Sequence, residues 1–285
     1  MNSQEIRYFN SLPSLLRQSY VKINIDNSNL LRIRVEETKI NFDEIVEVIG
    51  VRDYCILTFS STLDIQEFAE KANPFFGDLM SQTQEASSLI YSVEYNPQFN
   101  LSNMQLNSNS AQPMHTDGHF KEKSPKYLCL YCCEQAKNGG FSQMVFADDV
   151  YSYIKSLSLE IAEQLFSEYI EYSRRRPKGG LFKYNKKLFF RRNDGKIGIS
   201  YNPIMYEIKA DKKIEQALTL INYFTNKPSS QTIFRLQPNE MLILDNERVL
   251  HGRTSFDRTS RRKLKRLWFA GRNIEENGIK NMLII

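Results

Sequence analysis

Histidine is scarce in this chain, which has only three among its 285 residues. It has one tryptophan and no apolar run near the roughly 20 residues that span a bilayer. The first residues, MNSQEIRYFNSLPSLLRQSY, lack the basic-then-apolar pattern of a signal peptide. The few cysteines fit a reducing compartment; they are Cys55, Cys129, Cys132 and Cys133. We therefore predict a cytoplasmic protein without a membrane segment.

Neither sign of charge dominates, since 38 basic residues face 33 acidic ones and the net charge is +5. This balance does not indicate a nucleic-acid partner, but it agrees with a small anionic substrate. No low-complexity linker or internal repeat marks a domain boundary. We predict one domain over residues 1–285. The oligomeric state stays open, and a homo-oligomer is compatible with the sequence.

The predicted helices are few and the predicted strands are short. We expect one helix over 41–49 and another over KKIEQALTLINYFTN. A third should begin at a cap at Ser61 or Thr62 and end before Pro74. Two more are expected after a cap at Asp148 or Asp149. Strand candidates include YCILTF, SLIYSVEY, FSQMVFA, EMLILDNERVLHG and KLKRLWFAGR. This order favours a β-sandwich or barrel with helical additions.

The C-x-x-C spacing of Cys129 and Cys132 raises the alternative of a zinc site. Tetrahedral zinc needs four ligands, and no second cysteine or histidine pair has suitable spacing. We interpret YLCLYCCEQA as a buried strand in which cysteine acts as a small hydrophobic residue.

Two of the three histidines lie in QPMHTDGHF, residues 112–120, with Asp117 between them. On an extended segment, His115 and Asp117 point to the same side. His251, from a distant strand, would complete a set of two histidines and one carboxylate, which suits non-haem Fe(II). A helical zinc site of His115 and His119 is disfavoured by the proline and glycine of this segment and by its lack of glutamate. His119 could support a ligand, face the substrate or be exposed.

Two arginines follow His251 in the alternating run RRKLKRLWF. Arg262 and Arg266 would share one face of a strand because their separation is even. A guanidinium binds a carboxylate with two parallel hydrogen bonds, so one arginine could hold an anionic co-substrate and the other the substrate. The alternative is a solvated basic strand, since lysines alternate with them.

These segments together resemble the TauD/TfdA (taurine dioxygenase-like) family of Fe(II)- and 2-oxoglutarate-dependent oxygenases, over about residues 40–272. The motifs that carry the resemblance are PMHTDG, NGGFSQMVFADDVYSYI and LDNERVLHGRTSF with RRKLKRLWF, and they occur in the family's order. YCILTF and PFFGDL also lie where the family has its leading strand and its Phe-Gly turn.

The resemblance implies a mainly β fold with helical additions, namely a double-stranded β-helix (jelly roll, cupin-like), with a substrate-covering insertion at about 150–230. It implies that Fe(II) is the cofactor and that 2-oxoglutarate and O₂ are co-substrates. The implied ligands of iron are His115, Asp117 and His251. Arg262 would bind the distal carboxylate of 2-oxoglutarate, helped by Ser142 where the family commonly has threonine. Arg266 would approach the acidic group of the substrate.

The implied activity is oxidation of an unactivated C–H bond, coupled to conversion of 2-oxoglutarate into succinate and CO₂. Halogenating relatives lack the carboxylate ligand, so Asp117 favours hydroxylation or desaturation. The C-terminal motifs are similar to oxygenases of isonitrile biosynthesis (paerucumarin and rhabduscin type), which would imply a tyrosine-derived isonitrile acid in secondary metabolism. The aromatic residues expected to suit such a substrate are Phe182, Tyr184, Phe189 and Phe190.

Other functions stay open at this stage. A hydroxylase of a free amino acid, betaine or sulfonate fits the same residues. A nucleic-acid demethylase could use the basic turn RRRPKGG, but the near-neutral charge balance disfavours it. Retention of the three ligands and Arg262 disfavours a non-catalytic jelly-roll module.

Overall fold

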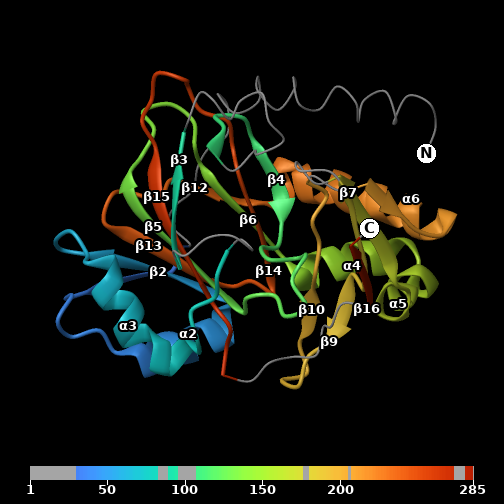
Figure 1. Cartoon of the computed structure of the whole chain (residues 1–285), viewed down its shortest axis with the longest axis horizontal. Coiled ribbons are helices and arrows are strands. Elements are labelled where there is room, and N and C mark those ends of the chain that lie inside the picture. Colours follow the sequence, from blue (N-terminus) through green and yellow to red (C-terminus); the bar gives the residue numbers. More distant parts are fainter. Residues whose placement is uncertain are drawn as a thin grey trace.

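Two of the sheets in the computed structural model face each other, with helices packed on their outer sides (Figure 1). The structure describes residues 30–82, 89–95, 107–175, 180–204, 207–272 and 280–284. No helix in these stretches has the length and apolarity to cross a membrane. The N-terminal segment and residues 176–179 of RRRPKGG lie outside the described residues.

The larger sheet has six strands, and neighbouring strands in it come from distant parts of the chain. In order they are β1 (Arg32–Val35), β2 (Tyr54–Phe59), β13 (Glu240–Asp245), β5 (Tyr127–Glu134), β15 (Lys263–Phe269) and β3 (Ile90–Glu94). The β1–β2 pair is parallel and the other pairs are antiparallel. The expected strand YCILTF is β2.

The smaller facing sheet is antiparallel and has four strands. In order they are β12 (Thr232–Phe234), β6 (Ser142–Phe146), β14 (Val249–Arg253) and β4 (Gln112–His115). Strands that alternate between the two sheets in this way form the double-stranded β-helix that the sequence predicts.

Alternation along each strand determines which side chains reach the space between the sheets. On β15, Leu264 and Trp268 pack in the apolar core between the sheets, whereas Leu267 and Phe269 pack on the outer side. Arg262 and Arg266 have the same parity as Leu264, and both are buried. They therefore point inward, and the solvated basic strand is excluded for this face.

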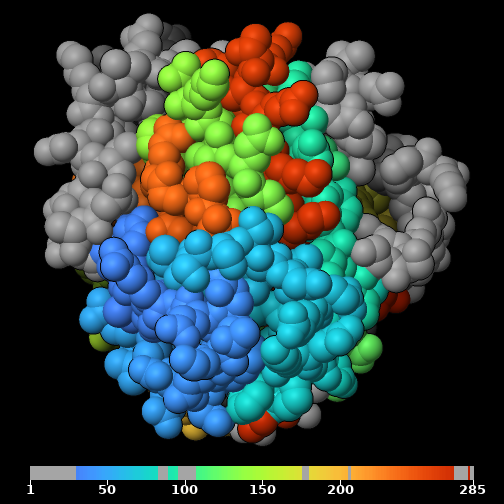
Figure 2. All heavy atoms as spheres, turned by 90° about the vertical axis from the view of Figure 1, so that its left-hand side faces the viewer, coloured from blue at the N-terminus to red at the C-terminus, as the bar shows by residue number. Residues whose placement is uncertain are grey.

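Helices α2 (Phe42–Arg52) and α3 (Ile65–Phe76) cover the outer face of the six-stranded sheet. Figure 2 looks at this face and shows their segment (blue to cyan) below the adjacent bands of β13, β5 and β15 (orange, green and red). Cys129, on β5, is buried on this outer side, as the interpretation of YLCLYCCEQA as an apolar strand predicts. The described cysteines are all free.

Both predicted limits of α3 are wrong. Its N-cap is Asp64, whose carboxylate accepts hydrogen bonds from the backbone N–H groups of Gln66 and Glu67 at 2.9 and 3.1 Å. Pro74 lies inside the last turn, where it removes one backbone hydrogen bond of the helix without ending it, and the C-cap is Gly77. Gly77 has φ +79°, and a Cβ there would lie 2.5 Å from the carbonyl oxygen of Gly271, so this position needs glycine.

The segment EMLILDNERVLHG is two strands, which corrects the prediction of one continuous strand. A turn over residues 246–248 separates β13 from β14 and takes the chain from one sheet to the other. The polar residues 245–248 interrupt the apolar run in the sequence, and in the structure they are nevertheless buried. Asn246, Glu247 and Arg248 all lie in the interior, where they are hydrogen-bonded.

Elements between residues 147 and 230, together with residues 280–284, form a layer behind the four-stranded sheet (Figure 1). It contains α4 (Ala147–Leu157), α5 (Leu159–Ser167), β7 (Ile170–Arg175), β8 (Leu181–Lys186), β9 (Phe189–Arg191), β10 (Ile197–Ile199), β11 (Glu207–Lys209), α6 (Lys212–Asn226) and the 3₁₀ turn η4 (Pro228–Ser230), with β16 (Lys280–Ile284) beside β8. Its apolar side chains pack on the outward residues Met114, Val145 and Leu250. The substrate-covering role predicted for about 150–230 stays a prediction.

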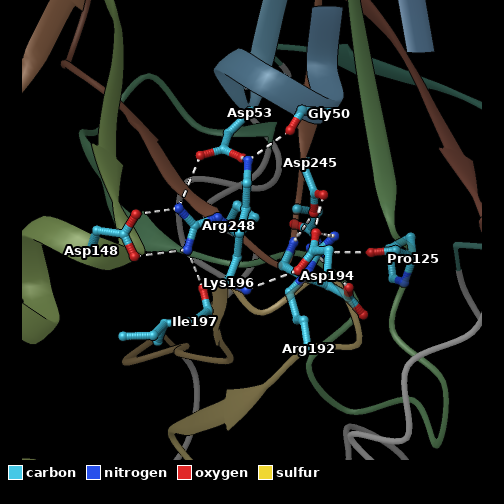
Figure 3. Close-up of polar contacts among 12 residues, drawn as sticks. Gly50, Asp53, Pro125, Asp148, Arg192, Asp194, Lys196, Ile197, Asp245 and Arg248 are labelled. Atoms are coloured by element: carbon cyan, nitrogen blue, oxygen red, sulfur yellow. Dashed lines mark hydrogen bonds and ion pairs between the residues drawn. The ribbon is translucent and has the colours of Figure 1, made fainter. Parts of the chain in front are cut away.

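The predicted cap of α4 is wrong, because the helix begins at Ala147 and its N-cap residue, Phe146, makes no side-chain cap bond. Asp148 instead binds the buried Arg248 on the turn after β13 (Figure 3). Figure 3 also shows Asp53 bound to Arg248, and Arg192 bound to Asp245. These ion pairs fix the 246–248 turn between α2, α4 and the β9–β10 hairpin.

Candidate metal and co-substrate site

His115, Asp117 and His251 converge between the two sheets. One ligand atom from each lies within 4.8 Å of the others, and all three residues are buried. Strand pairing explains the convergence, because β14 lies beside β4 with His251 opposite His115. The ring centroids of the two histidines are 4.3 Å apart. The structure therefore brings together the three residues that the sequence predicts as a metal site.

The first histidine is oriented by its own backbone. Nδ1 of His115 lies 2.8 Å from the carbonyl oxygen of Pro113, which can only accept a hydrogen bond. Nδ1 therefore carries the proton, and the lone pair of Nε2 faces the cluster, where a metal ligand needs it. The side-chain amide of Gln112 lies 3.2 Å from this Nε2.

Asp117 is held at its carboxylate and at its backbone. Arg266 Nη1 donates to both carboxylate oxygens, at 3.2 and 3.1 Å, and Trp268 Nε1 donates to Oδ2 at 2.9 Å. Asn246 accepts a hydrogen bond from the Asp117 N–H at 2.8 Å and donates one to its carbonyl at 3.0 Å. The carboxylate is thus fixed beside the two histidines, with Oδ1 3.4 Å from His115 Nε2.

The protonation states suit a divalent cation. Burial would raise the pKa of Asp117, but the charge of Arg266 and the neighbouring histidines outweigh it and hold the pKa well below the ordinary value. Burial, and then the proximity of His115, lowers the pKa of His251 to about 3. At neutral pH the cluster therefore presents a carboxylate and a neutral imidazole, which are the forms that bind metal.

Arg262 is buried deep in the same interior, yet no carboxylate of the described residues lies within 4.0 Å of it. Its Nε makes no hydrogen bond to them either. Burial lowers its pKa to about 10, so it stays charged at neutral pH. Leaving a charged group buried without a partner is costly, and a bound anion would remove that cost.

The Gly-Gly pair of the sequence lies against this arginine. Gly140 has φ +67°, and a Cβ added to it would lie 3.1 Å from Cδ of Arg262. Two residues later Ser142 begins β6, buried and on the inward face with Met144. The structure thus brings Arg262 and Ser142 to the same end of the space between the sheets as the predicted co-substrate pocket requires.

Two further residues differ from simple expectation. Arg266, predicted for the substrate, uses Nη1 on Asp117 and Nε on Gln82. His119 is fully buried, which excludes the exposed alternative, and its Nδ1 lies 2.7 Å from the hydroxyl of Tyr184. His119 belongs to the contact between the loop after Asp117 and the layer behind the sheet, outside the three-ligand cluster.

The aromatic residues predicted to suit an aromatic substrate pack elsewhere. Phe182, Tyr184 and Phe189 belong to the apolar cluster behind the four-stranded sheet. Phe190 is buried against Gly198 of the β9–β10 hairpin. They are core residues of the layer: Phe189 packs against Tyr151 of α4 and Phe166 of α5, whereas Tyr184 contacts His119.

Sequence reasoning missed the residues that support the ligands. Asn246 and Trp268 hold Asp117, and Gln112 contacts His115. Arg253, two residues after His251, is buried in the same interior. The only available signal was position, since each lies within a few residues of a predicted ligand or arginine along the chain.

The comparisons with known proteins agree with this geometry. Residues 38–268 match the family described as taurine catabolism dioxygenase TauD, TfdA family. The chain belongs to this family. It is therefore a non-haem dioxygenase that uses Fe(II) and 2-oxoglutarate to oxidise a small molecule, and it carries the H-x-D and distal histidine of the facial triad.

Solved structures show the same fold. A taurine dioxygenase from Burkholderia xenovorans aligns with a TM-score of 0.65 over 90% of this chain and 94% of that one, at 16% identity. PvcB from Pseudomonas aeruginosa aligns with a TM-score of 0.63 over 88% and 90%, at 13% identity. An asparagine oxygenase aligns with a TM-score of 0.58 over 80% and 77%, at 15% identity. These likenesses confirm the predicted double-stranded β-helix.

Proposed function

We propose that His115, Asp117 and His251 hold Fe(II), that Arg262 and Ser142 hold the distal carboxylate of 2-oxoglutarate, and that the enzyme hydroxylates or desaturates a small carboxylate. The observation that carries this proposal is the buried three-ligand cluster in the same interior as a buried arginine without a counter-ion. Two imidazoles and one carboxylate leave coordination positions open for a co-substrate and O₂.

Fe(II), when bound, would supply the oxidation of a C–H bond, with 2-oxoglutarate converted to succinate and CO₂. The chain supplies orientation and a dry environment. Pro113 fixes the tautomer of His115, while Trp268 and Arg266 fix the Asp117 carboxylate. Preorganised ligands and a buried site keep the reacting groups aligned and exclude water.

Arg266 supports an acidic substrate. Its Nε and Nη1 are engaged, and Nη2 makes no hydrogen bond to any described residue. The ring of Tyr91 lies 5.5 Å from its guanidinium carbon. A carboxylate of the substrate would accept a hydrogen bond from Nη2 and would thereby be held next to the ligand Asp117.

The acid is one of two kinds. PvcB, which has the same fold, is described as an Fe, alpha-ketoglutarate dependent oxygenase from an isonitrile synthetic pathway. The asparagine oxygenase structure contains 3-hydroxyasparagine and succinate. We keep the tyrosine-derived isonitrile acid as the first candidate and a free amino acid, betaine or sulfonate as the second. The core position of Phe182 and Tyr184 removes one argument for an aromatic substrate.

The test is anaerobic reconstitution followed by turnover. Protein with Fe(II) is titrated with 2-oxoglutarate, and the metal-to-ligand charge-transfer band is recorded. Air is then admitted with aromatic isonitrile acids, amino acids, betaines or sulfonates, and succinate is measured. A substrate raises succinate formation above the uncoupled rate and appears as a hydroxylated or desaturated product. If none of these acids does so while DNA does, the small-carboxylate proposal is wrong.

A further inference from the structure

The described part of the chain contains five buried arginines, and they fall into two groups. Three are neutralised by carboxylates: Arg192 by Asp245, Arg248 by Asp53 and Arg266 by Asp117. Figure 3 shows the first two of these pairs. The other two, Arg253 and Arg262, have no carboxylate of the described residues within 4.0 Å. Most of these buried arginines therefore have a carboxylate partner, and the two without one, Arg253 and Arg262, lie in the same part of the fold.

Arg253 and Arg262 belong to one end of the space between the sheets. Arg253 is directly opposite Ser142 in the β14–β6 pair. Gly140, two residues before Ser142, lies against Arg262. The loop that leads from β14 to β15 joins the same end, since Gly140 donates a backbone hydrogen bond to Ser255 at 3.0 Å. Two like charges buried at one end of a core repel each other unless an anion lies near both.

Arg253 is held in place before any ligand binds. Its Nη2 donates to the carbonyl oxygens of Ser108 and Ser110, at 2.7 and 2.6 Å. Its guanidinium carbon lies 4.9 Å from the ring centroid of Phe256. Carbonyl oxygens orient the group without removing its charge, and Nε has no hydrogen-bond partner in the described residues. Such a group is a fixed positive charge that needs no rearrangement on binding.

We propose that Arg253 is a second cationic residue of the co-substrate pocket and that its charge acts together with that of Arg262 on the distal carboxylate of 2-oxoglutarate. This inference rests on the proposed function of the site. It makes the pocket selective for a dicarboxylate, because a 2-oxo acid without the distal carboxylate would leave both charges uncompensated. A merely structural Arg253, which ties β14 to residues 108–110, would not discriminate between such ligands.

The experiment compares two ligands on four forms of the protein. Wild type, Arg253→Met, Arg253→Lys and the control Arg235→Met are loaded anaerobically with Fe(II). Each is titrated with 2-oxoglutarate and with 2-oxopentanoate, in which a methyl group replaces the distal carboxylate, and Kd is read from the charge-transfer absorbance. Arg235 is the matched control because it also donates to backbone carbonyls, those of Ala136 and Lys137, and has no carboxylate partner among the described residues.

Arg253→Met is expected to raise the Kd of 2-oxoglutarate by about tenfold or more, as for loss of a charge-assisted contact, and to leave that of 2-oxopentanoate unchanged. Arg253→Lys keeps the charge and gives a smaller rise, and Arg235→Met gives none. Binding of 2-oxopentanoate also reports that each variant is folded. An equal loss for both ligands would identify Arg253 as structural and overturn the inference, as would no loss for either. Absence of any band in wild type would instead refute the proposed function, and this inference with it.

Discussion

Asn246 connects the turn between the sheets to the carboxylate ligand, and its removal should weaken both folding and Fe(II) binding. Its side chain is 1% exposed. Oδ1 accepts from the Asp117 N–H at 2.8 Å, and Nδ2 donates to the carbonyls of Asp117 and Pro125 at 3.0 and 2.8 Å. All three partners are backbone groups that have no other hydrogen-bond partner among the described residues.

Asn246→Ala leaves these three backbone groups without a protein partner. Each buried unsatisfied group costs about 1–3 kcal/mol, and a water that enters the space recovers part of this. We expect the free energy of unfolding to fall by about 3 kcal/mol. Fe(II) affinity should fall too, because Asp117 loses both backbone restraints. Asn246→Asp should be worse than alanine, since it keeps the acceptor, loses both donors and adds a buried charge beside Asp117.

The assay is equilibrium unfolding in urea, with Fe(II) binding measured on the same proteins. Asn226→Ala is the control, because the Asn226 amide bonds only to Asn222 on the same helix, α6, among the described residues. The control should lose less than about 1 kcal/mol. If Asn246→Ala unfolds within about 0.5 kcal/mol of wild type and keeps its Fe(II) affinity, the argument that Asn246 positions Asp117 is refuted.

Three further predictions concern other parts of the fold. Gly140→Ala should weaken 2-oxoglutarate binding in the charge-transfer titration, because φ is +67° and the new Cβ would lie 3.1 Å from Arg262 Cδ; unchanged affinity would count against the assigned pocket. Burial lowers the pKa of Lys186 to about 7, while the unfolded chain keeps that proton to about pH 10. Between these pH values the unfolded state binds more protons than the folded state, so the free energy of unfolding should rise with pH. The slope in wild type should exceed that in Lys186→Met by up to about 1.4 kcal/mol per pH unit. Equal slopes of the two proteins in urea unfolding would contradict the buried position of Lys186. Arg192→Met should lower the free energy of unfolding by about 3–5 kcal/mol, because it leaves Asp245 and its neighbour Glu247 buried without their cation; a loss below about 1 kcal/mol by the same assay would contradict it.

The metal site could be predicted because its residues follow simple periodicity. His115 and Asp117 share a side of an extended segment, and a strand that carries His251 needs only to pair beside them. The even separation of Arg262 and Arg266 likewise predicts that they share one face, and the structure shows that this face points inward. Which side chains share a face of an extended segment depends only on their separation of two or four residues.

The supports of the site could not be predicted, because they depend on partners distant in the chain. The charged residues of the turn at 246–248 are buried because partners from distant parts of the chain reach them: Asp53 and Asp148 contact Arg248, and Arg192 contacts Glu247. His119 looked equally suited to exposure until the contact with Tyr184 was known. A sequence shows that a residue is polar, whereas only the folded chain shows whether a partner exists for it.

We propose that Fe(II) and 2-oxoglutarate bind together at the cluster of His115, Asp117 and His251. Anaerobic absorbance titration with 2-oxoglutarate, on wild type and on His115→Ala, tests it most directly. We expect a charge-transfer band in wild type that is lost in His115→Ala while the variant stays folded. A His115→Ala protein that retains Fe(II) binding, the band and 2-oxoglutarate turnover would contradict the assignment.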